Sequence, residues 1–128
     1  MIVACATDNG VNFIDRHFGD ALKYEIYQIS EKDSIYLKSI INTSKEEDHD
    51  DPRKANNIID LLLKENVEVG LTKVFGPNIE KLKLRLVPIL ISTNNIEEGL
   101  VKIREHFNDV SNAILLKDDR KYLDFRKK

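Results

Sequence analysis

Three groups of residues in the sequence have side chains suited to binding a metal or an anion. His17 lies in the stretch DRHFGD at 15–20, just after an apolar segment, so its imidazole is a candidate ligand at the end of a strand. Cys5 is the only thiol in the chain, and His49 sits in the acidic run EEDHDD at 46–51. No Walker loop, dinucleotide fingerprint, nucleophile elbow or zinc-ligand spacing accompanies them.

His17 has two interpretations that the residues leave open. As a neutral imidazole in a strand-end loop, it is a metal ligand that points into a cleft. As a lone histidine beside Phe18, it is a hydrogen-bonded residue that fixes a turn. In either case Phe18 belongs to the core. Gly19 follows an aromatic residue at a tight bend, so it is expected to adopt a positive φ.

Cys5 alone does not make an iron–sulfur site. Such clusters are normally held by several thiolates, often four, and this chain has one cysteine. A cysteine inside the apolar run 2–7 is usually a small buried hydrophobic residue. A preassembled cluster that docks through one or two protein ligands is compatible with this count, and Cys5 is a metal candidate in that sense.

The acidic run at 46–51 places five carboxylates around His49. Its spacing does not match an EF-hand loop, which has a glycine at its sixth position and a distant glutamate. We therefore expect a solvated loop whose acids favour the N-terminus of the following helix. His49 is a secondary metal ligand if this loop folds over the sheet toward His17.

A further candidate site lies at 76–78, where the sequence GPN opens a helix just after a strand. The free amide groups at such a helix start can meet an anion such as phosphate or a cluster sulfide. The alternative is a routine turn with Pro77 at the first helical position. Lys73, close by in the sequence, would supply positive charge to an anionic ligand.

Composition argues against several classes of function. The 128-residue chain has 41% hydrophobic and 33% charged residues, as an ordinary globular domain does. Its net charge of −2 provides no basic surface for nucleic acid. The longest apolar runs, such as VPILI at 87–91, are too short to span a membrane, and the N-terminus lacks the features of a signal peptide. A single cysteine fits a reducing interior, so we expect a cytoplasmic protein without nucleic-acid or membrane partners.

Hydrophobic periodicity predicts the order of the elements. Three strands with short connections come first and are expected to be antiparallel, and strands then alternate with helices, which is typical of parallel pairing. The predicted strands are 2–7, 24–29, 34–41, 67–75 and 87–92. The predicted helices begin at Pro52, with Asp51 as the cap and Asn66 as the stop, at Pro77, and at Asn94, with Glu97 completing a capping box. For 113–125 a hairpin over 118–119 and an extra helix both remain open.

These elements add up to an α/β fold of the ribonuclease-H-like type. It contains a mixed five-stranded sheet, an antiparallel meander followed by two parallel strands, with helices on its faces. We expect one domain over 1–107 and a C-terminal extension over 108–128 that packs on it. Nuclease chemistry on such a fold requires several carboxylates in one pocket. Asp8, Glu25 and Glu68 are not placed to converge, so we do not expect nuclease activity.

Two motifs together are moderately specific: His-Phe-Gly before an aromatic strand, and Gly-Pro at a later strand-to-helix turn. They lie in the segments HFGDALKYEIYQI (17–29) and VEVGLTKVFGPNIEKL (67–82). With the opening IVACATDNG, these segments resemble the dinitrogenase iron-molybdenum cofactor-binding family, and the likeness runs from residue 1 to about residue 107.

The resemblance implies a ribonuclease-H-like fold and a non-enzymatic module related to nitrogenase accessory proteins. Such a module would bind or carry an iron-molybdenum or iron–sulfur cluster and would work with a delivery or acceptor protein. The candidate residues for such a module are His17, Gly19, Lys73, Gly76 and Pro77 for binding the cofactor, and His17, His49 and Cys5 for the metal.

The chain departs from the family pattern in two places. Family members often have Gly-Gly just before the Gly-Pro turn, whereas this chain has bulkier residues over 72–75, which narrow or fill that site. Many relatives have a glycine-rich loop with histidine or cysteine before the first long helix, and here that loop is KEEDHDDP at 45–52. These departures favour an alternative, a protein-interaction or regulatory domain that keeps the fold without binding a cluster.

Overall fold

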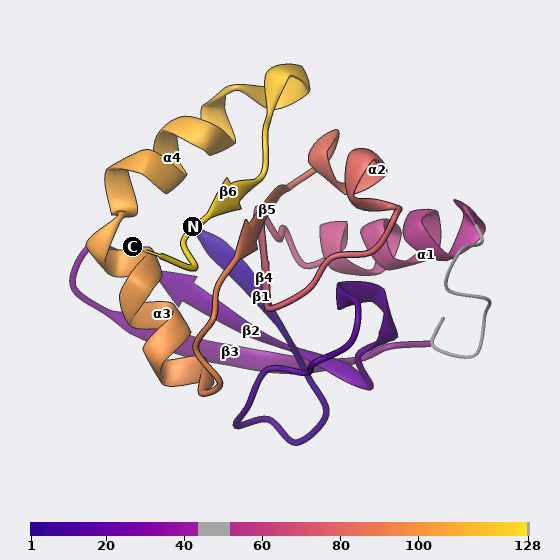
Figure 1. Ribbon diagram of the computed structural model, residues 1–128, viewed down its shortest axis with the longest axis horizontal. Coiled ribbons are helices and arrows are strands. Elements are labelled where there is room, and N and C mark those ends of the chain that lie inside the picture. The colour runs from indigo at the N-terminus through magenta and orange to yellow at the C-terminus, as the bar shows by residue number, and fades with distance from the viewer. Residues whose placement is uncertain (44–51, 128) are drawn as a thin grey trace.

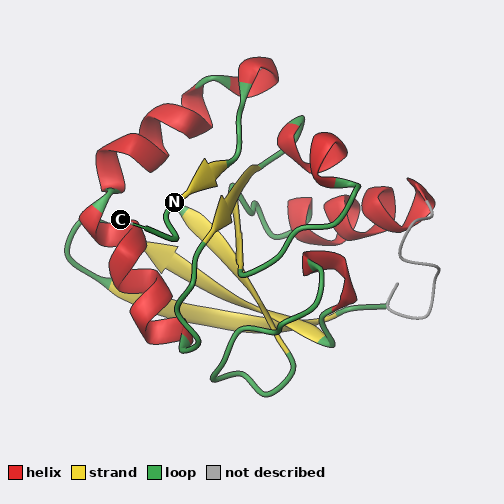
Figure 2. Cartoon of the chain, viewed as in Figure 1, coloured by secondary structure: helices red, strands yellow, loops and turns green. Residues whose placement is uncertain are grey.

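In the computed structural model, which describes residues 1–43 and 52–127, the chain forms a mixed β-sheet with helices on both faces (Figure 1). The strands are β1 (Ile2–Thr7), β2 (Lys23–Ile29), β3 (Ser34–Ile41), β4 (Val69–Thr72), β5 (Val87–Leu90) and β6 (Leu123–Asp124). The helices are α1 (Pro52–Leu63), α2 (Ile79–Lys83), α3 (Ile96–Glu105) and α4 (Phe107–Leu115), with short 3-10 turns at Phe18–Asp20 and Lys117–Asp119. Helices α1 and α2 cover one face of the sheet, and α3 and α4 cover the other (Figure 2).

The sheet has the order β3-β2-β1-β4-β5-β6. Strands β1, β2 and β3 pair antiparallel, whereas β4, β5 and β6 continue from β1 in parallel. The predicted combination of a meander and parallel strands is confirmed, but the predicted count of five strands is wrong. The sixth strand, β6, pairs with β5 through two residues, which is too short a segment to produce a periodic signal. The ribonuclease-H-like assignment and the boundary after residue 107 stay predictions.

The C-terminal segment resolves the alternatives left open for 113–125. Helix α4 already begins at Phe107, and the chain then turns at 117–119 and runs back as β6. The turn is not the tip of a hairpin, because β6 pairs with β5 and not with the segment before the turn.

Helix α1 follows the predicted apolar stripe. Ile58, Ile59 and Leu62 are 3%, 4% and 0% exposed, and they pack on the face of the sheet that also carries Ala4 and Ala6. The predicted stop at Asn66 is confirmed by its φ of 61°. The predicted cap Asp51 lies outside the described residues.

The cap of α3 is one residue later than predicted. Asn95, and not Asn94, accepts hydrogen bonds at its side-chain oxygen from the backbone N–H groups of Glu97 (2.8 Å) and Glu98 (3.4 Å). Two adjacent asparagines give the same sequence signal, so only the backbone geometry distinguishes them. Asn94 turns instead toward Lys73.

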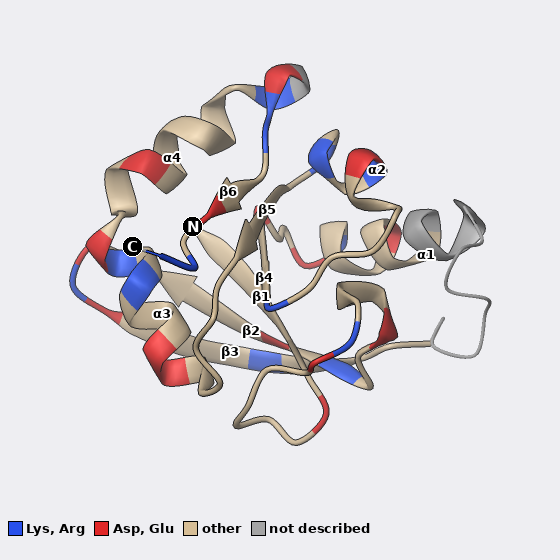
Figure 3. Cartoon of the chain, in the orientation of Figure 1, with Lys and Arg blue, Asp and Glu red and all other residues tan. Residues whose placement is uncertain are grey.

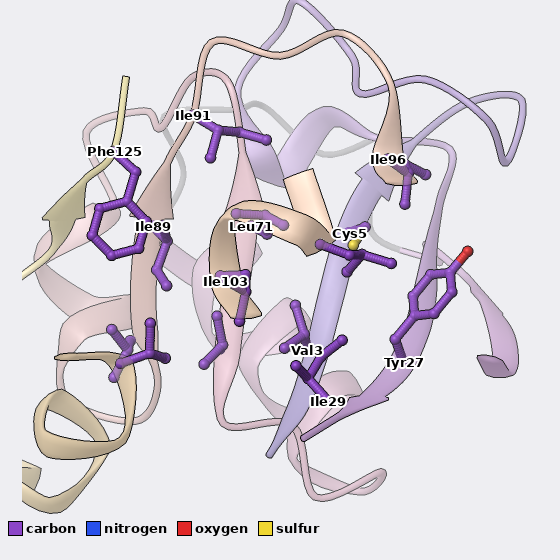
Figure 4. Packing of buried hydrophobic residues seen from close by; sticks show 14 of the residues in the cluster. Val3, Cys5, Tyr27, Ile29, Leu71, Ile89, Ile91, Ile96, Ile103 and Phe125 are labelled. Carbon is purple, nitrogen blue, oxygen red and sulfur yellow. The ribbon is translucent and has the colours of Figure 1, made fainter. Parts of the chain in front are cut away.

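Alternation along the strands divides the core into two layers. Val3, Cys5 and Leu71 point toward α3 and α4, where they meet Ile103 (Figure 4). The intervening residues of β1 point toward α1 and α2. Strands β1 and β4 carry no charged residue, and Lys, Arg, Asp and Glu of both signs are spread over helices, loops and outer strands (Figure 3). No helix among the described residues is long and apolar enough to cross a membrane.

Gly99 is the point of closest approach between α3 and the loop that follows β1. A Cβ atom at this position would lie 2.7 Å from Cε2 of Phe13 and 2.9 Å from Cδ1 of Ile91. Both neighbours are buried core side chains, at 5% and 1% exposed, so neither can move without disturbing the packing.

We expect Gly99→Ala to lower the free energy of unfolding by about 1–2 kcal/mol, because overpacking outweighs the better helix propensity of alanine. Chemical denaturation measures this change. Val101→Ala, at a position of the same helix that is 41% exposed, is the control and should stay within about 0.5 kcal/mol of wild type. A stabilised Gly99→Ala variant would contradict the packing described.

Candidate functional site

A small hollow lies where the loop around His17 meets the turn at Gly76. His17, Gly19 and Asp20 line it from one side, and residues 76–79 line it from the other, with Phe18, Ile58 and Leu82 completing the wall. Its cavity volume is about 30 Å³, enough for about one or two water molecules. Four of the residues predicted from the sequence therefore lie together here: His17, Gly19, Gly76 and Pro77.

Backbone pairing joins the two sides of the hollow. His17 forms a parallel bridge with Val74, and the N–H of Phe18 donates to the Val74 carbonyl at 2.9 Å. The His17 loop thus adds to the sheet just beyond the end of β4. Since segments 57 residues apart in the chain are tied by backbone hydrogen bonds, the spacing between the imidazole and the Gly76 turn is fixed by the fold.

Gly76 makes room for the imidazole of His17. A Cβ atom at position 76 would lie only 2.6 Å from Nδ1 of His17 and 3.0 Å from Cγ. The glycine is therefore needed for close approach of a ring, and not for a left-handed backbone. At Gly19 the predicted positive φ is wrong: among the chain's five glycines, all within the described residues, only Gly10 has a positive φ, of 81°. Gly19 lies instead in the 3-10 turn Phe18–Asp20.

Two buried side chains hold the His17 loop from inside. The hydroxyl of Tyr24 donates to the Phe18 carbonyl at 2.8 Å, and burial raises the pKa of this phenol, so the donor stays protonated. The side-chain amide of Asn42 donates to the carbonyls of Gly19 at 2.9 Å and Ala21 at 2.8 Å. Asn42 is 0% exposed, and sequence reasoning missed it, because a single asparagine after a strand reads as a turn residue.

An ion pair holds the same loop from outside. Arg16 donates through both terminal nitrogens to the Asp8 carboxylate, at 2.9 and 3.0 Å, and also to the Asp20 carbonyl at 3.0 Å. Asp8 accepts a further hydrogen bond from the N–H of Leu22 at 3.0 Å. The hydrogen bond from Arg16 is the main cause that lowers the pKa of Asp8 below its usual value.

The aromatic residues near the hollow form a stack beneath it. Phe18 is 1% exposed, and its ring lies 5.0 Å from Tyr24 and 5.3 Å from Phe75, centroid to centroid. Phe75, one of the bulky residues over 72–75, thus packs on Phe18 and does not line the hollow. Gly70 leaves the space under Phe18, since a Cβ there would be 3.1 Å from Cζ of that ring.

Three other predicted residues lie away from the hollow or outside the description. Cys5 is 0% exposed on the opposite face of the sheet, and burial raises the pKa of its thiol (Figure 4). Lys73 forms an ion pair with Asp15 and donates to the side-chain oxygen of Asn94 at 2.6 Å. His49 lies outside the described residues. Within the described part of the chain, no three His, Cys, Asp or Glu side chains are grouped to hold a metal ion.

A family model described as dinitrogenase iron-molybdenum cofactor matches residues 1–108, which include both sides of the hollow. The chain belongs to this family. A search among curated proteins found no match to the sequence. The description of this family links it to the iron-molybdenum cofactor of nitrogenase, and the resemblance proposed from His-Phe-Gly and Gly-Pro is confirmed.

In this member of the iron-molybdenum cofactor family, we expect Gly76→Ala to displace the His17 ring while the fold is retained. The added methyl carbon would lie only 2.6 Å from Nδ1 of His17, so the ring has to shift. A partly exposed side chain moves more easily than backbone, so we expect a loss of about 1 kcal/mol or less in stability. Imidazole resonances in a ¹H–¹⁵N NMR spectrum measure the displacement. The resonances of His106, at the junction of α3 and α4, serve as an internal control, and an unmoved His17 ring would contradict the contact.

A second expectation concerns pH and the outer ion pair. Because the folded protein lowers the pKa of Asp8 below its ordinary 3.8, the stabilisation is present above that pH and is lost as the pH falls through the lowered value. Asp8→Asn should therefore reduce stability at neutral pH by a few tenths to about 1 kcal/mol, a modest amount for a partly exposed pair. The difference from wild type should shrink in acid.

Denaturation curves of both proteins at several pH values measure this effect. Asp119→Asn, which removes an exposed carboxylate in the turn at 117–119, is the control and should stay within about 0.5 kcal/mol of wild type at neutral pH. A deficit of Asp8→Asn that persists unchanged in strong acid would contradict the role of the ion pair.

Proposed function

We propose that this chain is a non-enzymatic module that binds or carries a preassembled iron-molybdenum or iron–sulfur cluster at the hollow between His17 and the Gly76–Pro77 turn. The observation that supports it most is the close fit of an imidazole over a glycine at an open hollow, in a member of the iron-molybdenum cofactor family. Imidazole is a common metal ligand, and Nδ1 and Nε2 are chemically distinct.

A cluster at this site would be cargo held by one protein ligand. Cys5 is buried on the other face of the sheet, so the described residues supply His17 as the imidazole at the hollow and no thiolate. The hollow accepts a water-sized group, so the body of a cluster would rest at its mouth with one metal atom toward the ring. A single coordinate bond suits a carrier, which has to release what it binds.

Charge does not drive binding in this proposal. Among the described residues that line the hollow there is no lysine or arginine, and Asp20 contributes a carboxylate. Lys73 and Arg16 are near in sequence or space, but each is paired with an aspartate. Affinity for an anionic cluster would therefore come from the metal–nitrogen bond.

The acids considered for nuclease chemistry have structural partners, which supports a non-enzymatic role. Asp8 is bound by Arg16, and Glu25 accepts a hydrogen bond from Ser39 at 2.5 Å. Glu68 accepts one from the N–H of Ile2 at 3.1 Å. Asp8 follows β1, Glu25 lies on β2 and Glu68 precedes β4, and none of them lines the hollow.

The second candidate is a protein-interaction or regulatory domain that has lost cluster binding. The ion pair between Lys73 and Asp15 favours it, because it neutralises the positive charge that would attract an anionic ligand. In that case His17 serves only to fix the loop.

Anaerobic incubation with iron, sulfide and molybdate, followed by gel filtration, separates the two candidates. We expect the wild-type protein to retain metal with absorption in the near-ultraviolet and visible range, and His17→Ala to lose about tenfold or more of the bound metal. His106→Ala removes the other described histidine and should bind as wild type does.

The unfolding curve of His17→Ala distinguishes loss of a ligand from loss of the fold. His17 is partly exposed, so the variant should remain folded. Colourless, metal-free wild-type protein would favour the interaction domain, and equal metal retention by His17→Ala would remove His17 from the site.

A further inference from the structure

Strand β3 is an open edge of the sheet. It is eight residues long, and within the described residues it pairs only with β2 (Figure 1). The opposite edge, β6, has only two residues. Side chains on β3 are unusually apolar for such an edge, with Ile35, Tyr36, Leu37 and Ile41 at 56%, 52%, 44% and 62% exposed. Long apolar edges of this kind invite pairing with another strand.

We propose that β3 pairs antiparallel with β3 of a second copy, so that two sheets join into one across a two-fold axis. Pairing along the full strand sets Ser34 opposite Ile41 of the other copy, because the sum of two opposed residue numbers is constant. By the same rule Ile35 faces Ile40, Tyr36 faces Ser39, and Leu37 faces Lys38. This inference rests on the edge strand and is independent of the cluster site.

A β-bulge in β3 makes this register possible. In a symmetric antiparallel pair, opposed residues must point to the same face of the sheet. Residues 36 and 39 would point to opposite faces in a regular strand. Here the register shifts at Leu37, so that the ring of Tyr36 lies 5.4 Å from Tyr27 while Ser39 bonds to Glu25 at 2.5 Å, both on the face covered by α3. The bulges of the two copies would lie opposite each other, and the ladder would continue on both sides.

Charge also fits a second copy. Lys38 is the only charged residue of β3, and the full-length register sets it against Leu37 and not against the other Lys38. Each Lys38 also keeps its own partner, since its ammonium group lies 3.0 Å from the carboxylate of Glu65. Both strands thus contribute apolar side chains without placing like charges directly opposite each other.

Size-exclusion chromatography coupled to light scattering tests for the dimer by measuring the molecular mass at increasing protein concentrations. We expect the wild-type mass to rise from 14.8 kDa toward twice that value. Leu37→Lys places two lysines opposite each other and should keep the protein at the monomer mass. Leu37→Glu, the matched control, places a carboxylate opposite Lys38 and should retain the dimer, which separates this register from a general loss of apolar area.

Position 37 is exposed, so both variants should fold, and circular dichroism checks that they do. The double variant Tyr36→Cys with Ser39→Cys tests the register directly, because it should form a disulfide-linked dimer on oxidation, whereas Tyr36→Cys alone should not. The native Cys5 is buried and does not contribute. Wild-type protein that stays monomeric at all concentrations would overturn the proposal, and this is also the result expected if β3 pairs with a different protein. A dimer that Leu37→Lys leaves intact would overturn it as well.

Discussion

The insertion of Phe18 over Gly70 is the contact on which the arrangement of the hollow depends. The central strand β4 has a glycine at the one position where the ring of Phe18 descends onto the sheet. Once that ring is buried, the N–H of Phe18 meets the Val74 carbonyl, and its own carbonyl meets Tyr24. The backbone at His17 is held in place, because the N–H and the carbonyl of the adjacent Phe18 are both hydrogen-bonded. An apolar contact therefore sets the position of the polar group.

Polar side chains also hold the backbone of the His17 loop. Asp8 with Arg16 on the outside, and Tyr24 with Asn42 on the inside, satisfy backbone groups that a turn would otherwise leave to solvent. The side chain of His17 is thus carried on a frame that other residues maintain.

Much of this fold could be predicted from the sequence because the signals are local. The apolar stripe of α1 and the alternation in β1 appear directly as periodicity, and residue type and position single out His17 and Gly76, which the structure brings together at the hollow. Asn42 and Gly70 could not be found in the same way, since their importance depends on what approaches them from distant segments. Strand β6 could not be predicted for a different reason, because a strand of two residues is too short to show hydrophobic alternation. The α3 cap is at Asn95 and not at Asn94 because of the backbone geometry, which the sequence of two adjacent asparagines does not reveal.

The burial of Cys5 protects its thiol from oxidation. Its sulfur lies in the interior between β1 and α3, where neither dissolved oxygen products nor another thiol has ready access, and the chain has no second cysteine with which to form a bridge. A site based on imidazole does not undergo the stepwise sulfur oxidation that inactivates thiolate sites. If the protein carries a cluster as proposed, oxidants would destroy the cluster while the buried thiol of Cys5 stays intact.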